Sequence, residues 1–177
     1  VSRFGSTVEH VLAPSASTPQ TLRRLKPAVD AIDADLGGTE MEAALRAVFA
    51  LPVPRDCAGA DVLLVTDGEI WQAEEMIAAA RASGHRVFAI GVGSSPAEGV
   101  LRALAEATGG ACEFATPGEA LEAAAGRMLV RIRQQPWRDA RIDWGCEPLW
   151  QTALPSSVFG GDTVIAFAGA PAAAPAS

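Results

Sequence analysis

A regular alternation of short apolar runs with helical patterns constrains the fold of this chain more than any other feature. Residues 62–66 (VLLVT) and 87–90 (VFAI) are continuous apolar runs, which are typical of strands buried on both faces. A segment with helical apolar spacing, about ten residues long, follows each run. Strands that alternate with helices in this way favour right-handed crossovers. The sequence therefore predicts an α/β fold in three layers, with helices on both faces of a mostly parallel sheet.

Further elements are expected before and after this unit. Residues 3–12 predict a strand or a hairpin around Gly5 and Ser6, and residues 112–114 predict a short strand. Thr18 followed by Pro19 begins a helical pattern that runs to Leu36, which Pro27 should kink or divide. One further helix is expected to begin at the capping box of residues 39–42, and another to span residues 74–83. A third carries the apolar residues of 100–107 and stops at Gly109 and Gly110, and the last opens at residues 116–117 and reaches residue 132.

The pattern changes after Gln135. Residues 140–144 alternate between apolar and charged side chains, and residues 164–167 form a second strand-like run. No helical spacing continues there, and the chain ends in a run of alanine and proline. We therefore predict an α/β domain over residues 1–134, followed by a β-rich appendage and an Ala/Pro-rich tail over residues 135–177.

Composition excludes several classes of protein. The 177 residues include 14 Lys and Arg against 21 Asp and Glu, a net charge of −7, so nucleic-acid binding through phosphate contacts is not expected. No apolar run is long enough to span a membrane. The three cysteines, Cys57, Cys112 and Cys146, are odd in number and far apart, which argues against a zinc site or a disulfide framework.

The chemistry that the sequence offers lies in three loops that follow predicted strands or open helices. Residues 37–39, 67–69 and 91–95 supply hydroxyl, carboxylate and backbone groups, but no Lys, Arg, Cys or His. In an α/β sheet such loops meet at the carboxyl edge, where ligands bind. Oxygen donors suit Mg²⁺ better than acid–base or nucleophilic catalysis.

Motifs for enzymes are missing from the sequence. It contains no G-x-S-x-G elbow and no phosphate-binding G-x-x-x-x-G-K-[ST] loop, and residues 91–93 lack the third glycine of a dinucleotide site. His10 and His85 are not near a candidate nucleophile in the pattern. We expect no enzymatic activity, and a hydrolase or phosphatase is the weakest of the alternatives.

The loops also carry a family resemblance. Residues 37–45 (GGTEMEAAL) and 63–69 (LLVTDGE) resemble a von Willebrand factor type A domain of the kind found in inter-α-trypsin-inhibitor heavy-chain-like (VIT/VWA) proteins. Residues 3–6, 90–93 and 109–110 match in the same order. Residues 155–162 resemble the β-rich region that follows the domain in those proteins. The resemblance covers nearly the whole chain.

The resemblance implies a metal-ion-dependent adhesion site. Thr39 would be its hydroxyl ligand and Asp67 its carboxylate ligand, and both should lie at one pole of the sheet, close enough to share a cation or a water network. A partner protein's acidic side chain would complete the shell of the Mg²⁺ ion. Each residue also has an ordinary structural explanation, since threonine caps helices and Asp-Gly is common in turns.

The chain departs from the family at its first motif, D-x-S-x-S, which is missing. Residues 13–17 (APSAS) have alanine in place of the aspartate and follow the wrong strand. We therefore expect the family's first strand to be missing, with residues 62–66 as one wall of the resulting slot. Another segment or another chain should supply that strand. With two ligands only, ordered Mg²⁺ is expected in the complete domain and not in this chain.

These observations predict a protein-interaction module of the adhesion type, which binds a partner's acidic group through a divalent cation at the carboxyl edge of the sheet. The alternative is a metal-free structural scaffold domain within a larger protein. Magnesium-dependent stabilisation that depends on Asp67 would separate the two.

Overall fold

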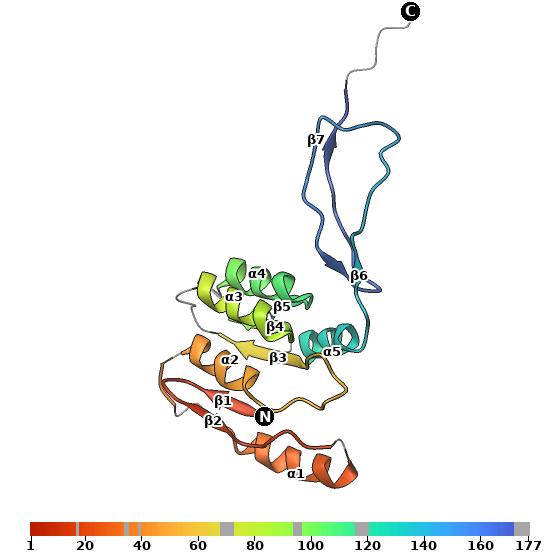
Figure 1. The fold of residues 1–177 in the computed structure, drawn as a ribbon. Helices are drawn as coiled ribbons and strands as arrows, with labels where there is room; N and C mark the ends of the chain where they lie inside the picture. Colours follow the sequence, from red (N-terminus) through yellow and green to blue (C-terminus); the bar gives the residue numbers. More distant parts are fainter. Residues whose placement is uncertain are drawn as a thin grey trace, which may run out of the picture.

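The computed structural model describes residues 1–16, 18–33, 36–38, 40–67, 73–93, 97–115 and 121–171. Its centre is a parallel three-stranded sheet in the order β3 (Asp61–Thr66), β4 (Arg86–Val92) and β5 (Cys112–Ala115). Leu64 of β3 pairs with Ala89 of β4, which pairs in turn with Cys112. Figure 1 shows helices on both sides of this sheet. The predicted three-layer α/β fold is confirmed.

The helices form two unequal layers. α2 (Met41–Phe49), α3 (Ala73–Ser83) and α4 (Glu98–Thr108) pack side by side on one face of the sheet, and α5 (Leu121–Ile132) covers β4 and β5 on the other face. Because β4 lies between the two layers, its residues 87–91 are all buried. Each large apolar side chain buried there contributes about 1.5–3 kcal/mol. The core therefore lies around β4.

The prediction that residues 62–66 are buried on both faces is wrong. Val62, Leu64 and Thr66 face the layer of α2 and α3, whereas Leu63 is 41% and Val65 44% exposed on the face of α5. The reason is that α5 packs against β4 and β5, and no element among the described residues covers this face of β3. β3 is therefore apolar on both faces, but the described residues cover only the face of α2 and α3.

The amino-terminal part forms a hairpin and a helix. β1 (Ser2–Phe4) and β2 (Val8–His10) pair antiparallel around Gly5 and Ser6, as predicted. Thr18 caps α1 (Pro19–Asp30) by accepting a hydrogen bond from the backbone N–H of Thr21 at 3.1 Å, also as predicted.

The predicted length of this helix is wrong, and Pro27 does not divide it. α1 ends at Asp30 and not at Leu36, because the N–H of Ile32 already bonds to the carbonyl of Val29 in a tighter turn. Pro27 lies inside one continuous helix. That helix has no buried residue, so the carbonyl that proline leaves without a partner can bind water.

The predicted capping box of residues 39–42 falls partly outside the described residues, because Thr39 does. In the part that the structure describes, α2 begins at Met41, and its N-cap Glu40 makes no side-chain capping hydrogen bond. Glu42 accepts a hydrogen bond from Arg46 one turn later, at 2.8 Å.

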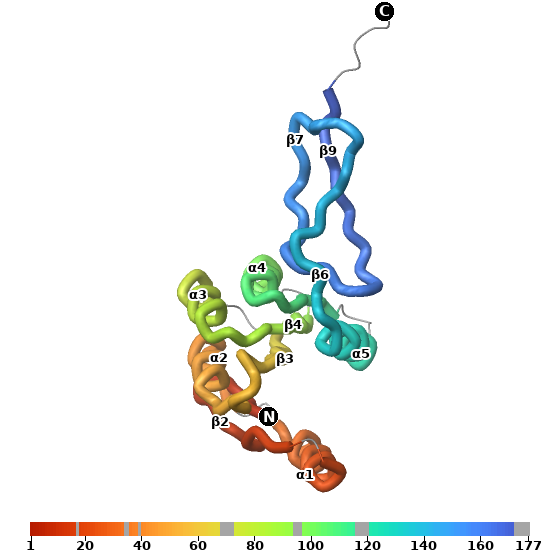
Figure 2. The backbone as a smooth tube through the Cα atoms, turned by 45° about the vertical axis from the view of Figure 1, so that its right-hand side comes forward, coloured from red at the N-terminus to blue at the C-terminus, as the bar shows by residue number. Residues whose placement is uncertain are grey.

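Residues 137–171 form a β-rich arm, which extends away from the α/β body in Figures 1 and 2. β6 (Trp137–Arg138) pairs with β8 (Ser157–Val158), and β7 (Trp150–Gln151) pairs with β9 (Ala168–Gly169). The predicted strands at residues 140–144 and 164–167 are misplaced, since neither segment is extended sheet. Asp139 has a positive φ of 55°, which redirects the chain directly after β6.

The arm contacts the body through several residues between Ser156 and Asp162, of which Phe159 is buried. Phe159 is only 2% exposed and packs in the core between β4 and α5, with its ring 5.9 Å from that of Phe88. Arg131 of α5 binds Glu113 of β5 and, at 2.9 Å, Asp162 of the arm. Burial lowers the pKa of Arg131, but its hydrogen bonds to the two carboxylates leave it raised overall. These contacts anchor the arm to the sheet.

Candidate functional site at the carboxyl edge of the sheet

Asp67 directly follows the buried Thr66 at the carboxyl end of β3. Its side chain is exposed, and it forms no hydrogen bond or ion pair with any residue that the structure describes. The neighbouring strand β4 ends beside it, because Thr66 pairs with Gly91. Asp67 therefore presents a carboxylate to solvent at the edge where ligands of α/β sheets bind.

The loop before α2 is fixed at the end of β1. The N–H of Ser6 donates to the carbonyl of Leu36 at 2.8 Å, and the N–H of Glu40 donates to the carbonyl of Gly5 at 2.9 Å. A Cβ on Gly5 would lie 2.6 Å from the carbonyl oxygen of Gly37, so only glycine allows this close approach. Sequence reasoning missed this clamp, although a glycine at the end of a short strand is a signal for it.

Thr39, the predicted hydroxyl ligand, lies outside the described residues. Its neighbours Gly38 and Glu40 lie at the carboxyl end of β1, and Asp67 lies at that of β3. β1 and β3 run in the same direction in Figure 1. The approach of Thr39 to Asp67 nevertheless stays a prediction.

The described residues fit a magnesium ion only in part. Asp67 supplies an oxygen donor of the kind Mg²⁺ prefers. However, no group of three or more His, Cys, Asp or Glu side chains that could hold a metal occurs in the described ranges. Mg²⁺ requires near-octahedral oxygen coordination, so these residues alone would leave the ion mostly hydrated.

Two of the side chains that could have served catalysis, those of His85 and Cys112, are held within the fold. His85 is buried, stacks on Phe49 at 5.4 Å between ring centroids, and accepts from the N–H of Ala60 at 2.8 Å. Burial raises the pKa of Cys112 from 9.0 to about 12, which keeps the thiol protonated at neutral pH. Cys57 and Cys146 are free and exposed.

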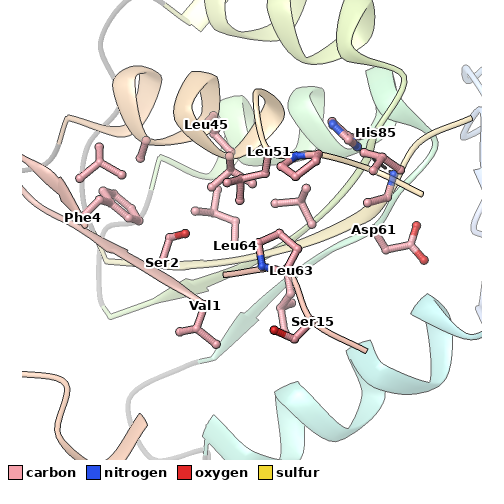
Figure 3. Close-up of a pocket in the computed structure, with 18 of the residues that line it drawn as sticks. Val1, Ser2, Phe4, Ser15, Leu45, Leu51, Asp61, Leu63, Leu64 and His85 are labelled. Atoms are coloured by element: carbon pink, nitrogen blue, oxygen red, sulfur yellow. Dashed lines mark hydrogen bonds between the residues drawn. The ribbon is translucent and has the colours of Figure 1, made fainter. Parts of the chain in front are cut away.

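A cavity of about 950 Å³ opens beside β3, away from β4. One wall is β3 itself, and the opposite wall is the hairpin, through Val1, Ser2, Phe4 and Val8. Figure 3 shows Phe4, Leu45 and Leu64 on the side of α2, and Leu63 and Ser15 on the side of α5. Most of the lining side chains are apolar.

No helix in the described part of the chain is long and apolar enough to cross a bilayer.

The chain resembles known proteins along most of its length. The model of the von Willebrand factor type A domain family matches residues 1–114. The human von Willebrand factor A domain-containing protein 5A is 30% identical over 93% of this chain and 22% of its own length. The mouse von Willebrand factor A domain-containing protein 5B1 is 26% identical over 93% of this chain and 14% of its own length. The chain thus spans less than a quarter of these relatives.

Solved structures show the same fold. An aerotolerance-related membrane protein from Bacteroides fragilis matches with a TM-score of 0.59 at 16% identity, over 74% of this chain and 76% of that protein's chain. The protein BatB from Bacteroides thetaiotaomicron matches with a TM-score of 0.50 at 18% identity, over 62% and 68%. At this identity the likeness shows the fold alone. Together with the family match, it shows that the chain belongs to the von Willebrand factor type A domain family.

Proposed function

We propose that this chain is the core of a protein-interaction module of the adhesion type. In the complete domain, a divalent cation held at the carboxyl edge by Thr39 and Asp67 would bind an acidic group of a partner protein. Membership of a family whose domains generally mediate protein interactions supports the proposal. The observation that carries it is the exposed carboxylate of Asp67 at the end of β3, which no described residue engages.

Magnesium would supply an electrophilic centre for a partner's carboxylate. Because the described residues offer too few ligands, the ion would need further oxygen donors from polypeptide beside β3. We accordingly include in the proposal a strand supplied there by another segment or another chain. The 177-residue chain alone is then expected to bind Mg²⁺ only weakly.

The test is a magnesium titration of a longer piece of the parent protein, followed by thermal unfolding. Ligand at about 100 times its Kd stabilises a protein by about 2.7 kcal/mol, which is readily measured. We expect 5 mM MgCl₂ to raise the Tm of the unaltered protein and to leave that of Asp67→Asn unchanged. Asp56→Asn is the matched control, because Asp56 is an exposed aspartate in the loop before β3 and away from the carboxyl edge.

The outcomes separate the two candidate functions. An equal Tm rise in Asp67→Asn would contradict the assigned site. The complete lack of a Tm rise in the unaltered protein would favour the alternative, a metal-free structural scaffold domain. The interaction itself is tested by the loss of partner capture in EDTA, with Asp67→Asn as the comparison.

A further inference from the structure

The outer edge of β5 carries unpaired backbone groups. Among the described residues β5 is the last strand of the sheet, with β4 on its inner side. The N–H of Ala89 in β4 donates to the carbonyl of Ala111 at 2.9 Å, which places Ala89 opposite Cys112. Backbone groups alternate in direction along a strand, so those of Cys112 and Phe114 face away from β4. They form no hydrogen bond with a described residue.

A second cavity, of about 330 Å³, lies against the amino end of this edge. It is bounded by residues 110–112 at the start of β5, by α4 and by the arm. An extended chain occupies about 160 Å³ per residue, at about 3.3 Å per residue, about 4.8 Å between strands and about 10 Å between layers. The cavity therefore admits about two residues of an extended peptide that lies along β5.

The two sides of this cavity differ in chemistry. α4 contributes the charged residues Arg102 and Glu106. The arm contributes Val164 and Ile165, which are 40% and 75% exposed, and Asp162 just before them binds α5. These two apolar residues thus lie on the side of α5. Successive side chains of an extended peptide point to opposite faces, so one would meet α4 and the next would meet the apolar residues of the arm.

The cavity has one charge that is not balanced. Arg102 pairs with Glu98 at 2.7 Å, and Arg131 is held by carboxylates of β5 and of the arm. Glu106 is exposed, and its carboxylate forms no hydrogen bond or ion pair with a described residue. A ligand with a positive side chain on the side of α4 is therefore favoured over one with a negative side chain.

We propose that the outer edge of β5 binds an extended peptide of a partner protein by β-strand addition. A Lys or Arg side chain of the peptide lies next to Glu106, and the following apolar side chain packs on Val164 and Ile165. Backbone hydrogen bonds to Cys112 and Phe114 supply affinity, and the alternate side chains supply specificity. This surface is at the opposite edge of the sheet from β3 and needs no cation, so the inference goes beyond the proposed function.

The test is an NMR titration of the 177-residue chain in EDTA with the synthetic peptide acetyl-Thr-Val-Lys-Val-Thr-amide. We expect saturable shifts of the backbone amides of Cys112 and Phe114, and about tenfold weaker binding of a peptide with Glu in place of Lys. Glu106→Gln should weaken binding of the lysine peptide about threefold to fivefold. Glu75→Gln is the matched control and should leave it unchanged, because Glu75 is exposed on α3 and forms no ion pair with a described residue.

Two further peptides test the backbone pairing. Successive N–H groups of an extended peptide point in opposite directions, so only one of two neighbouring N–H groups can donate to β5. One peptide is N-methylated at the lysine and the other at the valine that follows it. We expect at least tenfold weaker binding in one of the two, and a much smaller loss in the other.

A lack of saturable shifts up to about 5 mM peptide would overturn the proposal. So would shifts confined to β3, because the peptide would then bind the other edge of the sheet. Equal affinities of the lysine and glutamate peptides, or of the two N-methylated peptides, would also overturn it. EDTA removes any bound metal, so failure here is distinguishable from failure of the magnesium titration.

Discussion

Gly109 and Gly110 separate α4 from β5, and each has a different reason to be glycine. Gly109 ends the helix with a φ of 75°, in the left-handed region. Gly110 lies so close to β4 that a Cβ would stand 1.9 Å from the carbonyl oxygen of Val87. The sequence indicates a helix stop at this pair, but it cannot show that the second glycine is required by a strand more than twenty residues earlier.

Gly110→Ala is therefore expected to destabilise the fold by more than about 3 kcal/mol, because backbone must move to admit the methyl group. Gly126→Ala is the matched control: Gly126 is exposed inside α5, and a Cβ there would meet nothing within 4 Å. Alanine at that position should stabilise by about 0.5–1 kcal/mol. Urea unfolding measures both, and equal effects would contradict the close approach at Gly110.

The cysteines should differ in reactivity. Burial raises the pKa of Cys112 to about 12, whereas Cys57 and Cys146 are exposed. At pH 8 we expect two thiols to react rapidly with iodoacetamide and Cys112 to react slowly, as resolved by mass spectrometry. Since the folded state keeps this proton, stability should fall as the pH rises above 9.0, where the unfolded thiol ionises first. Three equal rates would contradict the burial of Cys112.

At the scale of the elements, the described part of the arm packs on the body through one buried apolar side chain, that of Phe159. Phe159→Ala is expected to cost about 3–5 kcal/mol, because the ring is buried among the side chains of β4 and α5. Phe167→Ala, on an exposed part of the arm, should change the free energy of unfolding by no more than about 0.5 kcal/mol. Urea unfolding gives the difference, and limited proteolysis should cut the arm faster in Phe159→Ala alone. Equal effects of the two variants would show that the arm is not anchored by Phe159.

The elements also show how far the sequence can be interpreted. Strands β3 and β4 were predictable, because continuous apolar runs report burial. The exposure of Leu63 and Val65 was not predictable. An apolar run indicates that a strand suits burial, but it does not show which of its faces a helix covers. The arm was predictable as β-rich, but its ladders of two residues are set by the turn at Asp139 and the contact of Gly169 with Trp150.

At the scale of the whole molecule, the candidate site is predictable in part for the same reason. Asp67 follows β3 as the motif predicts, because a polar residue after a buried strand falls at the sheet edge. The clamp of Gly5 on Gly37 comes from tertiary packing and has no signature in either motif alone. Under the proposed function, the remaining ligands would come from polypeptide beside β3. Among the described residues, the molecule is thus a parallel sheet whose edge strand β3 borders a cavity of about 950 Å³.

Residue-resolved amide hydrogen exchange of the 177-residue chain tests this claim most directly. Arg86 of β4 donates its N–H to the carbonyl of Ala60, just before β3, and backbone groups alternate in direction along a strand. The N–H groups of Val62 and Leu64 therefore face β4, whereas those of Leu63 and Val65 face the cavity. We predict that exchange alternates along β3, with Val62 and Leu64 slower than Leu63 and Val65 by at least about 100-fold. Equally slow exchange at all four residues would contradict the account, because β3 would then be paired on both sides within the chain.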